Sequence, residues 1–314
     1  MIRYYSEVVP TDVDWLWYPY IPFGKITLLQ GDPGEGKSTF AIRIASIITN
    51  GGTFPDGYQL HRPESVIYQC AEDGAADTIK PRLVSAGADC ERIAFIEDDH
   101  LVIGNDRIEQ AIAASKARCL ILDPIQSFLP SDSDMHNAQK MRGLLSGLSE
   151  IAEKYSCAVI LIGHMTKASA NKQLYRGLGS IDIAALSRSI LMIARDIERP
   201  EIRYMFPVKS SLAPEGDAIG FIFDRGTGFH WLGRCVIKKD NLSEGTPKPI
   251  GKKEHAMELL KIMLSAGEVQ SNEVYSRLKE LGIGERTIRS AVKELDLKAS
   301  KKGSSWYLKF KKDE

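Results

Sequence analysis

Short apolar runs alternate with amphipathic stretches through most of the chain. Apolar, β-prone runs predict buried strands at residues 26–29, 65–70, 93–96, 119–122, 158–163 and 189–194. Apolar positions at helical spacing predict helices at 41–48, 107–115 and 138–155, with a short helix at 180–187. Residues 201–209 and 218–223 read as closing, antiparallel strands. We therefore expect an α/β fold, with a mostly parallel sheet flanked by helices.

The pattern changes after residue 234. Residues 235–252 are rich in Gly, Pro, Lys and Ser, which is typical of a linker. Beyond them, three amphipathic helices and a β-hairpin predict a winged helix over 253–314. The expected organisation is an N-terminal arm at 1–24, a main domain at 25–234, this linker and a small C-terminal domain.

The main domain opens with a nucleotide-binding signature. The strand at 26–29 is followed by Gly31-x-x-x-x-Gly36-Lys37-Ser38 and then by a helix, which is the context that a P-loop requires. Glycines let backbone N–H groups turn toward phosphate oxygens, and the helix N-terminus adds positive charge. Lys37 can reach the β- and γ-phosphates, and Ser38 can hold Mg²⁺. The expected binding segment is Gly31, Asp32, Pro33, Gly34, Glu35, Gly36, Lys37, Ser38 and Thr39.

Three further polar residues follow predicted strands, where parallel sheets bind ligands. Asp123 ends an apolar strand in the Walker B manner and could hold the Mg²⁺ water shell opposite Ser38. Glu72 could polarise the water that attacks the γ-phosphate; the alternative is a surface turn with Asp73 or Asp77 capping the next helix. His164 could contact the γ-phosphate, or it could be a histidine satisfied within a loop.

Other parts of the chain leave alternatives open. The aromatic cluster at 15–22 either packs on the core or a neighbouring subunit, or forms a lid over the nucleotide base. The five cysteines show no C-x-x-C pair and read as small hydrophobes in a reducing cytoplasm. No apolar run is long enough to span a bilayer.

Charge is distributed unevenly along the chain. The net charge is zero overall, but residues 248–314 hold 15 Lys and Arg against 10 Asp and Glu, a net charge of +5. A basic tail indicates a polyanionic partner. On its third helix and at the wing tip, basic residues lie off the buried stripe and could contact DNA: Arg286, Arg289, Lys293, Lys301 and Lys302. The alternative is a protein-docking winged helix with a solvated basic face.

The ordered motifs resemble RecA-type ATPases, and within them the RepA-like hexameric helicase branch, especially its mobile-element and prophage AAA-25 members. The matching stretches are WLWYPYIPFGKITLLQGDPGEGKST, CAEDG, LILDPIQSF, LIGHMTK and YRGLGSIDIAALSRSILMI. The resemblance implies that Lys37, Ser38 and Asp123 bind MgATP and that Glu72 is the catalytic carboxylate. It implies further that His164 senses the γ-phosphate and that Arg188 is an arginine finger acting on the next subunit. Arg176 is the runner-up finger, and Lys209 a second trans-acting cation. The C-terminal tail departs from the minimal helicases of this branch.

Three functions follow as expectations. The first is a DNA-dependent ATPase acting as a ring helicase, or helicase loader, in replication of a mobile element. Its hexameric ring would grip single-stranded DNA with the loops at 130–137 and 165–176, the second of which includes Lys167 and Lys172. The second is an ATP-switched regulator that binds duplex DNA without unwinding it. The third is a RecA-like recombinase, for which the short N-terminal arm offers no evident filament-forming domain.

Overall fold

The computed structural model describes most of the chain, in two compact units. The described residues are 4–130, 138–164, 181–224, 228–237, 256–257, 260, 263–264, 268–280, 283–302 and 305–310. The chain divides into Met1–Gly245 and Thr246–Glu314. Among the described residues, no helix combines the length and apolarity needed to cross a membrane.

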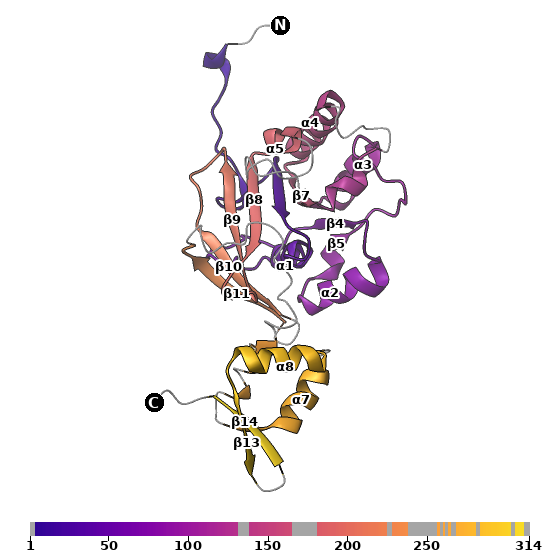
Figure 1. Cartoon of the computed structure of the whole chain (residues 1–314). Coiled ribbons are helices and arrows are strands. Elements are labelled where there is room, and N and C mark those ends of the chain that lie inside the picture. Colours follow the sequence, from indigo (N-terminus) through magenta and orange to yellow (C-terminus); the bar gives the residue numbers. More distant parts are fainter. Residues whose placement is uncertain are drawn as a thin grey trace. The chain divides into compact units, whose positions relative to one another are not determined.

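A nine-stranded sheet forms the centre of the first unit (Figure 1). Its order is β11-β10-β9-β8-β3-β7-β6-β4-β5. The strands that run parallel are β3 Ile26–Gly31, β4 Val66–Cys70, β5 Ile93–Ala94, β6 Cys119–Asp123, β7 Ala158–His164 and β8 Ser189–Arg195. The antiparallel strands are β9 Ile202–Ser210, β10 Ala218–Asp224 and β11 Gly228–Cys235. This confirms the predicted α/β fold with a mostly parallel sheet.

Helices cover both faces of the sheet, and each face has its own buried cluster. The helices of one face are α1 Lys37–Asn50 and α2 Lys80–Ser85, the latter preceded by the π-helical turn Ala75–Ile79. The helices of the other face are α3 Asp106–Ser115, α4 Ala138–Tyr155 and α5 Ile181–Leu186. Short 3-10 turns lie at Tyr5–Glu7, Cys90–Arg92 and Ile125–Phe128. The central strands are buried on both sides, which explains their continuous apolar runs.

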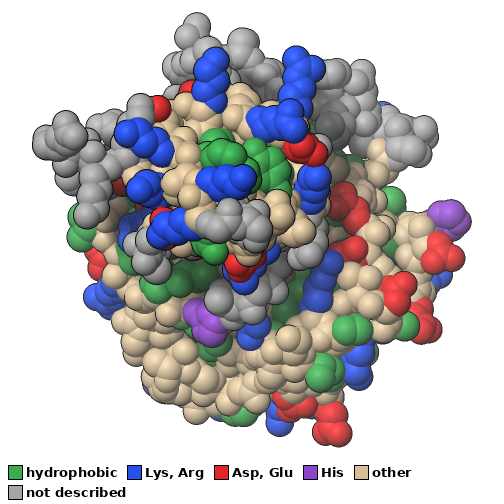
Figure 2. Space-filling view, turned by 60° about the horizontal axis from the view of Figure 1, so that its bottom comes forward, with side chains coloured by type: hydrophobic (Ala, Val, Ile, Leu, Met, Phe, Trp, Pro, Cys, Tyr) green, Lys and Arg blue, Asp and Glu red, His purple; other side chains and the backbone are tan. Residues whose placement is uncertain are grey.

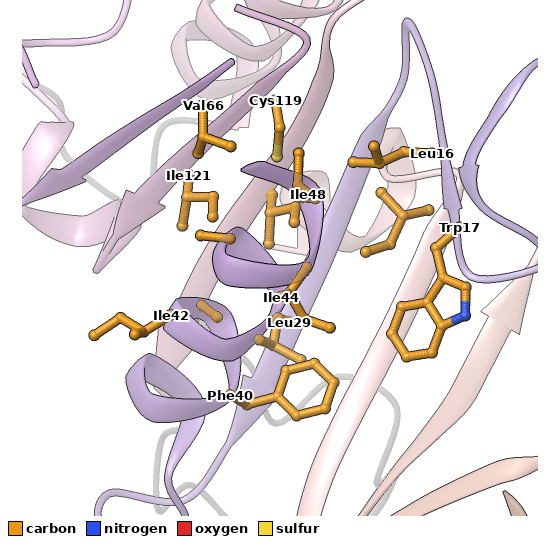
Figure 3. Close-up of a cluster of buried hydrophobic side chains, with 14 of the residues drawn as sticks. Leu16, Trp17, Leu29, Phe40, Ile42, Ile44, Ile48, Val66, Cys119 and Ile121 are labelled. Carbon is orange, nitrogen blue, oxygen red and sulfur yellow. The ribbon is translucent and has the colours of Figure 1, made fainter. Parts of the chain in front are cut away.

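The N-terminal aromatic cluster belongs to the core of the first unit. It forms a small antiparallel pair, β1 Trp15–Trp17 and β2 Ile21–Pro22. Trp17 is fully buried and stacks on Phe54, with ring centroids 4.6 Å apart. Figure 3 shows Trp17 beside Phe40 of α1 and Leu29 of β3. The structure thus favours packing on the core over a lid.

Two strand predictions need correction. The run at 93–96 pairs as a strand only over Ile93–Ala94. Beyond it, the Gln69 side chain bonds both backbone groups of Ile96, which replaces the ladder that a longer strand would form. β11 was not predicted, because two glycines and exposed polar residues interrupt its apolar pattern.

The second unit has a small core of its own. Its described elements are β12 Val269–Gln270, α7 Ser271–Glu280, α8 Glu285–Glu294, β13 Lys298–Lys302 and β14 Ser305–Lys309. The three strands form one sheet in the order β12-β14-β13. Buried side chains from both helices and β14 meet at Val274, Leu278, Ile288, Ala291 and Leu308, together with Ala256, Leu260 and Leu264 from the preceding segment. Much of that segment lies outside the described residues, so the winged helix stays a prediction.

Candidate nucleotide site

The P-loop lies where β3 meets α1, and backbone geometry explains its glycines. A Cβ on Gly31 would lie 2.5 Å from the carbonyl oxygen of Ile193 in the neighbouring strand β8. Gly34 and Gly36 have φ values of +82° and +85°, which other residues adopt at a cost. The loop therefore needs glycine at Gly31 for space and at the other two positions for conformation.

The N-terminus of α1 faces this loop. Gly36 is its N-cap residue, and no side chain among the described residues accepts a hydrogen bond there. The first N–H groups of a helix lack intrahelical acceptors and carry partial positive charge. This end of α1 is therefore suited to bind a phosphate.

Lys37 is buried at the base of the loop. Its Nζ donates to the carbonyl oxygens of Gly31 and Asp32, each at 2.8 Å. Burial lowers the pKa of Lys37 to about 8, although nearby carboxylates, Asp123 first among them, oppose the shift. A bound phosphate would offer the ammonium group a charged partner in place of neutral carbonyls.

Asp123 lies at the carboxyl end of β6, two strands from the P-loop strand. It is 4% exposed and accepts a 2.8 Å hydrogen bond from the Tyr68 hydroxyl. Burial, followed by the charge of Asp123, raises the pKa of Tyr68 well above its usual range, so this phenol remains a donor. Tyr68 thus holds one oxygen of the Asp123 carboxylate in place at the carboxyl end of β6.

Glu72 follows β4 at the same edge. Cys70, the last residue of β4, is in register with Asp123, and the Ala71 N–H donates to the Asp123 carbonyl. Glu72 is exposed, and its negative charge acts on Lys37. The alternative of a cap by Asp73 or Asp77 is not found in the described structure: the turn at Ala75–Ile79 has no side-chain cap, and Asp73 pairs with Arg82 at 2.7 Å.

The residues present fit a magnesium ion. Mg²⁺ takes oxygen ligands, usually one or two protein groups with water and phosphate oxygens completing the shell. The Ser38 hydroxyl, one residue after Lys37 at the start of α1, and the Asp123 carboxylate, whose charge acts on Lys37, supply such oxygens. They would hold the ion, which when bound neutralises charge on the β- and γ-phosphates.

The structure also places Arg195 and Arg203 against the P-loop, and neither was predicted as a site residue. Glu35 is 2% exposed, and its Oε2 lies 3.4 Å from Arg195 Nε and 4.0 Å from Arg203 Nε. Arg195 also donates to the Gly34 carbonyl. Burial raises the pKa of Glu35, and the two arginines oppose that shift. The sequence signal for this pair would have been two arginines eight residues apart on consecutive strands. Arg195 of β8 and Arg203 of β9 are direct partners in the sheet.

The antiparallel part of the sheet closes against the P-loop through these residues. Arg203 donates to the Phe223 carbonyl at 2.7 Å, and its guanidinium lies 5.1 Å from the Phe223 ring centroid. A Cβ on Gly36 would lie 3.3 Å from that ring. Phe223 of β10 therefore supports the loop on the side of the antiparallel strands.

Two of the proposed trans-acting cations, Arg188 and Lys209, lie at the opposite edge of the sheet. The Arg188 N–H donates to the carbonyl of Ile26, the first residue of β3, and its side chain is exposed. Lys209 Nζ donates to the carbonyls of Ala184, Ala185 and Ser187 at the end of α5. Burial and the charge of Arg188 lower the pKa of Lys209. Along β8, this edge is about 20 Å from the P-loop edge.

Several predicted residues lie outside the described part of the chain. His164 ends β7, in register with Gly31, but its side chain is among the undescribed ones. Lys167, Lys172 and Arg176 also lie outside the described residues, as does the segment 131–137.

The predicted DNA contacts of the second unit are exposed, and two of them have carboxylate partners. Arg289 pairs with Glu285 at 2.7 Å, and Lys302 pairs with Glu268. Arg286, Lys293 and Lys301 are also exposed. Figure 2 shows one face on which Lys and Arg side chains lie around exposed hydrophobic ones. A phosphate group would have to compete with Glu285 for Arg289.

Comparison with known proteins identifies the first unit. The profile of AAA_25, described as an AAA domain, matches residues 5–170, more than half of the chain. The chain belongs to the AAA_25 family. With the P-loop and Asp123 on one sheet edge, this AAA_25 protein is a P-loop ATPase of RecA-like fold.

Curated relatives match part of the same region. DNA repair protein RadA of Mycobacterium tuberculosis is 29% identical over 152 residues, which are 47% of this chain and 28% of RadA. RadA of Streptococcus pyogenes is 27% identical over 149 residues, 46% of this chain and 28% of the relative. The AAA_25 protein therefore aligns with less than a third of these relatives.

Solved structures share the fold. One solved ATPase domain matches with a TM-score of 0.52 and 14% identity, covering 67% of this chain and 84% of that one. A DnaB-like replicative helicase matches with a TM-score of 0.51 and 14% identity, covering 64% and 56% of the two chains. A KaiC-like protein from Pyrococcus horikoshii matches with a TM-score of 0.50 and 19% identity, covering 71% and 99%. At these identities the likeness concerns the fold.

Proposed function

We propose that this AAA_25 protein is a DNA-dependent ATPase that works as a ring-shaped helicase, or helicase loader, in replication of a mobile element. One observation carries the proposal. The P-loop, Glu72 and Asp123 meet at one sheet edge, and the same chain continues into a separately packed basic unit. A nucleotide site and a DNA-binding surface in one chain are the two parts that a DNA motor requires.

Hydrolysis would use the residues of the P-loop edge. Lys37 and the α1 N-terminus hold the phosphates, and Ser38 with Asp123 holds Mg²⁺. Glu72, exposed at the tip of β4, accepts a proton from the attacking water. His164, at the end of the strand next to β3, would report whether the γ-phosphate is present.

Assembly would complete this site. Arg188 is exposed at the sheet edge away from its own P-loop, so its guanidinium is available to a second copy. As a finger in trans it would stabilise charge on the γ-phosphoryl oxygens, with Arg176 as the alternative finger and Lys209 as a second cation. A homohexameric ring would present the segments 130–137 and 165–176 to single-stranded DNA.

The names of the similar proteins support a role in DNA metabolism. RadA is a DNA repair protein, and one structural neighbour is a DnaB-like replicative helicase. In this chain, the basic second unit would bring the ATPase to duplex DNA through Arg286, Arg289, Lys293, Lys301 and Lys302. These contacts would make binding depend strongly on salt concentration.

Strand displacement tests the proposal. Purified protein with ATP and Mg²⁺ is expected to separate a forked duplex, and Lys37→Ala protein is expected to bind the fork without separating it. For a loader, the forked duplex should instead stimulate ATP hydrolysis without strand separation. Assembled protein that hydrolyses ATP, but neither unwinds nor responds to DNA, would reject the proposal.

A second candidate is an ATP-switched DNA-binding regulator without unwinding activity. The independent core of the second unit favours it, since that unit could bind duplex DNA while the ATPase sets the oligomeric state. This candidate predicts a footprint at a defined duplex site that is lost in Arg286→Ala/Lys293→Ala protein with ATP hydrolysis intact. Protection without any preferred site would count against it.

A further inference from the structure

Strand β14 of the second unit carries an exposed tryptophan. Trp306 and Leu308 share one face, because side chains alternate along a strand. Leu308 is 3% exposed and packs in the core of the unit. Trp306 is 53% exposed, so most of this large ring extends past the core that Leu308 covers. Neither α7 nor α8 buries it.

The surroundings of Trp306 are basic. Its direct partner across the hairpin is Lys301. The segment 298–309 contains Lys298, Lys301, Lys302 and Lys309 and no acidic residue. Lys302 pairs with Glu268 and lies 5.9 Å from the Tyr307 ring, on the other face of the strand pair. An exposed apolar ring in this setting suits a ligand that has both a flat apolar face and negative charge.

A nucleic-acid base next to a phosphate has this combination. Stacking of a base on an aromatic side chain contributes free energy, and Lys side chains nearby bind the backbone. Within continuous duplex, both faces of each base are already stacked, and opening a step costs a few kcal/mol. At a duplex end or at the junction of a fork, one face of the last base is open. The open base therefore offers the ring a partner without that cost.

We propose that Trp306 stacks on the terminal base pair, or on the first unpaired base, of a DNA end or fork, with Lys301 on the adjoining phosphate. This inference rests on the proposed DNA-binding function and narrows its ligand from duplex DNA to ends and junctions. Contacts from α8 to duplex phosphates fix the position of the second unit on DNA, and Trp306 makes it prefer an end or a fork junction over continuous duplex.

The test uses the full chain and three DNAs: a fork with 2-aminopurine at the junction, the same fork with 2-aminopurine inside the duplex arm, and a relaxed closed circular duplex. Wild-type protein is expected to quench 2-aminopurine at the junction and not inside the arm. Trp306→Ala should weaken binding to the fork by about 10- to 100-fold, remove the quenching and leave binding to the circle unchanged.

Two variants serve as controls. Trp306→Phe keeps an aromatic ring and should restore most of the affinity for the fork, which also shows that the strand tolerates substitution. Tyr5→Ala removes an exposed aromatic ring from the first unit and should change nothing. Circular dichroism on each variant verifies folding.

The outcomes distinguish failure of the Trp306 stacking contact from failure of the proposed DNA-binding function. Wild-type protein that binds none of the three DNAs would overturn the proposed DNA-binding function. Binding to the circle and the fork with equal loss in Trp306→Ala, or with no loss in either, would overturn the stacking contact alone. A Trp306→Ala effect on oligomeric mass, with binding to the fork unchanged, would assign the ring to contact with a second copy.

Discussion

The two edges of the central sheet carry cations in opposite situations. At the P-loop edge, Lys37 and Arg203 are almost fully buried and are held by carbonyl oxygens, with Glu35 beside Arg203. At the other edge, Arg188 is exposed, and Lys209 is held by the end of α5. Buried cations such as Lys37 and Arg203 bind groups of their own chain. An exposed cation far from the site of its own chain is the kind that can serve another copy.

This comparison distinguishes residues by the consequence of losing them. Removal of a buried, paired charge leaves its partner without compensation and lowers stability. Removal of an exposed charge lowers stability little, so any large effect on turnover must come from a contact in the assembly. Stability and turnover, measured together, therefore separate the two edges.

The largest effect is expected for Arg188→Ala. Loss of an arginine finger lowers turnover by about 10³-fold or more, while ATP binding and the melting temperature should stay near wild type. Mixing this variant with Lys37→Ala protein should restore part of the hydrolysis, because a mixed interface pairs an intact P-loop with an intact finger. Arg62→Ala, at another exposed arginine, is the matched control. Mixed assemblies that remain inactive would remove Arg188 from the trans role.

Arg203→Ala should have the next largest effect, on stability. Glu35 would keep only Arg195, whose side chain is 22% exposed and lies 3.4 Å away. We expect a loss of about 3 kcal/mol in the free energy of unfolding, measured by urea denaturation. Arg195→Ala should cost less, because solvent screens that pair. The double variant Glu35→Gln/Arg203→Met should recover part of the loss; a cost below that of Arg195→Ala would contradict the burial argument.

Lys37 predicts a pH dependence of stability in the nucleotide-free protein. Its folded pKa is about 8, below the value of an unfolded lysine. Above pH 8 the folded state therefore binds fewer protons than the unfolded state, and stability rises with pH until the unfolded lysine also titrates. Relative to Lys37→Met, wild-type protein should gain about 2 kcal/mol between pH 7 and 9.5. Parallel pH profiles for the two proteins would show that Lys37 keeps an ordinary pKa.

Lys209→Met should have the smallest effect. The ammonium group satisfies three carbonyls at the end of α5, so its loss should cost about 1 kcal/mol of unfolding free energy. Because those carbonyls hold the group in place, turnover should fall less than in Arg188→Ala. Lys209→Arg should keep most of the stability. A loss of turnover equal to that of Arg188→Ala, at unchanged stability, would make Lys209 chiefly a trans-acting cation.

The sequence predicted the elements whose information is local. The P-loop, Asp123 and the parallel strands carry continuous apolar runs or fixed spacings, and apart from β5 the structure contains these elements close to their predicted bounds. The pairing of Glu35 with Arg195 and Arg203 depends on the register of β8 with β9, which no local pattern specifies. β11 was missed for the same reason, since its partner β10 determines it more than its own composition does.

The position of the proposed finger Arg188 relative to the P-loop could not be predicted either. The sequence of a strand does not show which of its two ends faces the P-loop. Arg188 directly precedes β8 and Arg195 is its last residue, so the two arginines lie at opposite edges of the sheet. Only the direction of β8 relative to β3 decides which arginine lies beside the P-loop. The roles of Glu72, His164 and Arg188 stay predictions, and the Arg188→Ala variant above tests the last of them.

The Phe223 ring beside Gly36 limits how the phosphate loop can adapt. A Cβ on Gly36 would lie only 3.3 Å from the Phe223 ring, so the loop cannot move toward β10 unless β10 also moves. The strand after β10 carries the polypeptide onward to the basic unit. A nucleotide that displaces the P-loop toward β10 would therefore also displace the β10–β11 hairpin, which is the last described strand pair of the first unit before the basic unit in the chain.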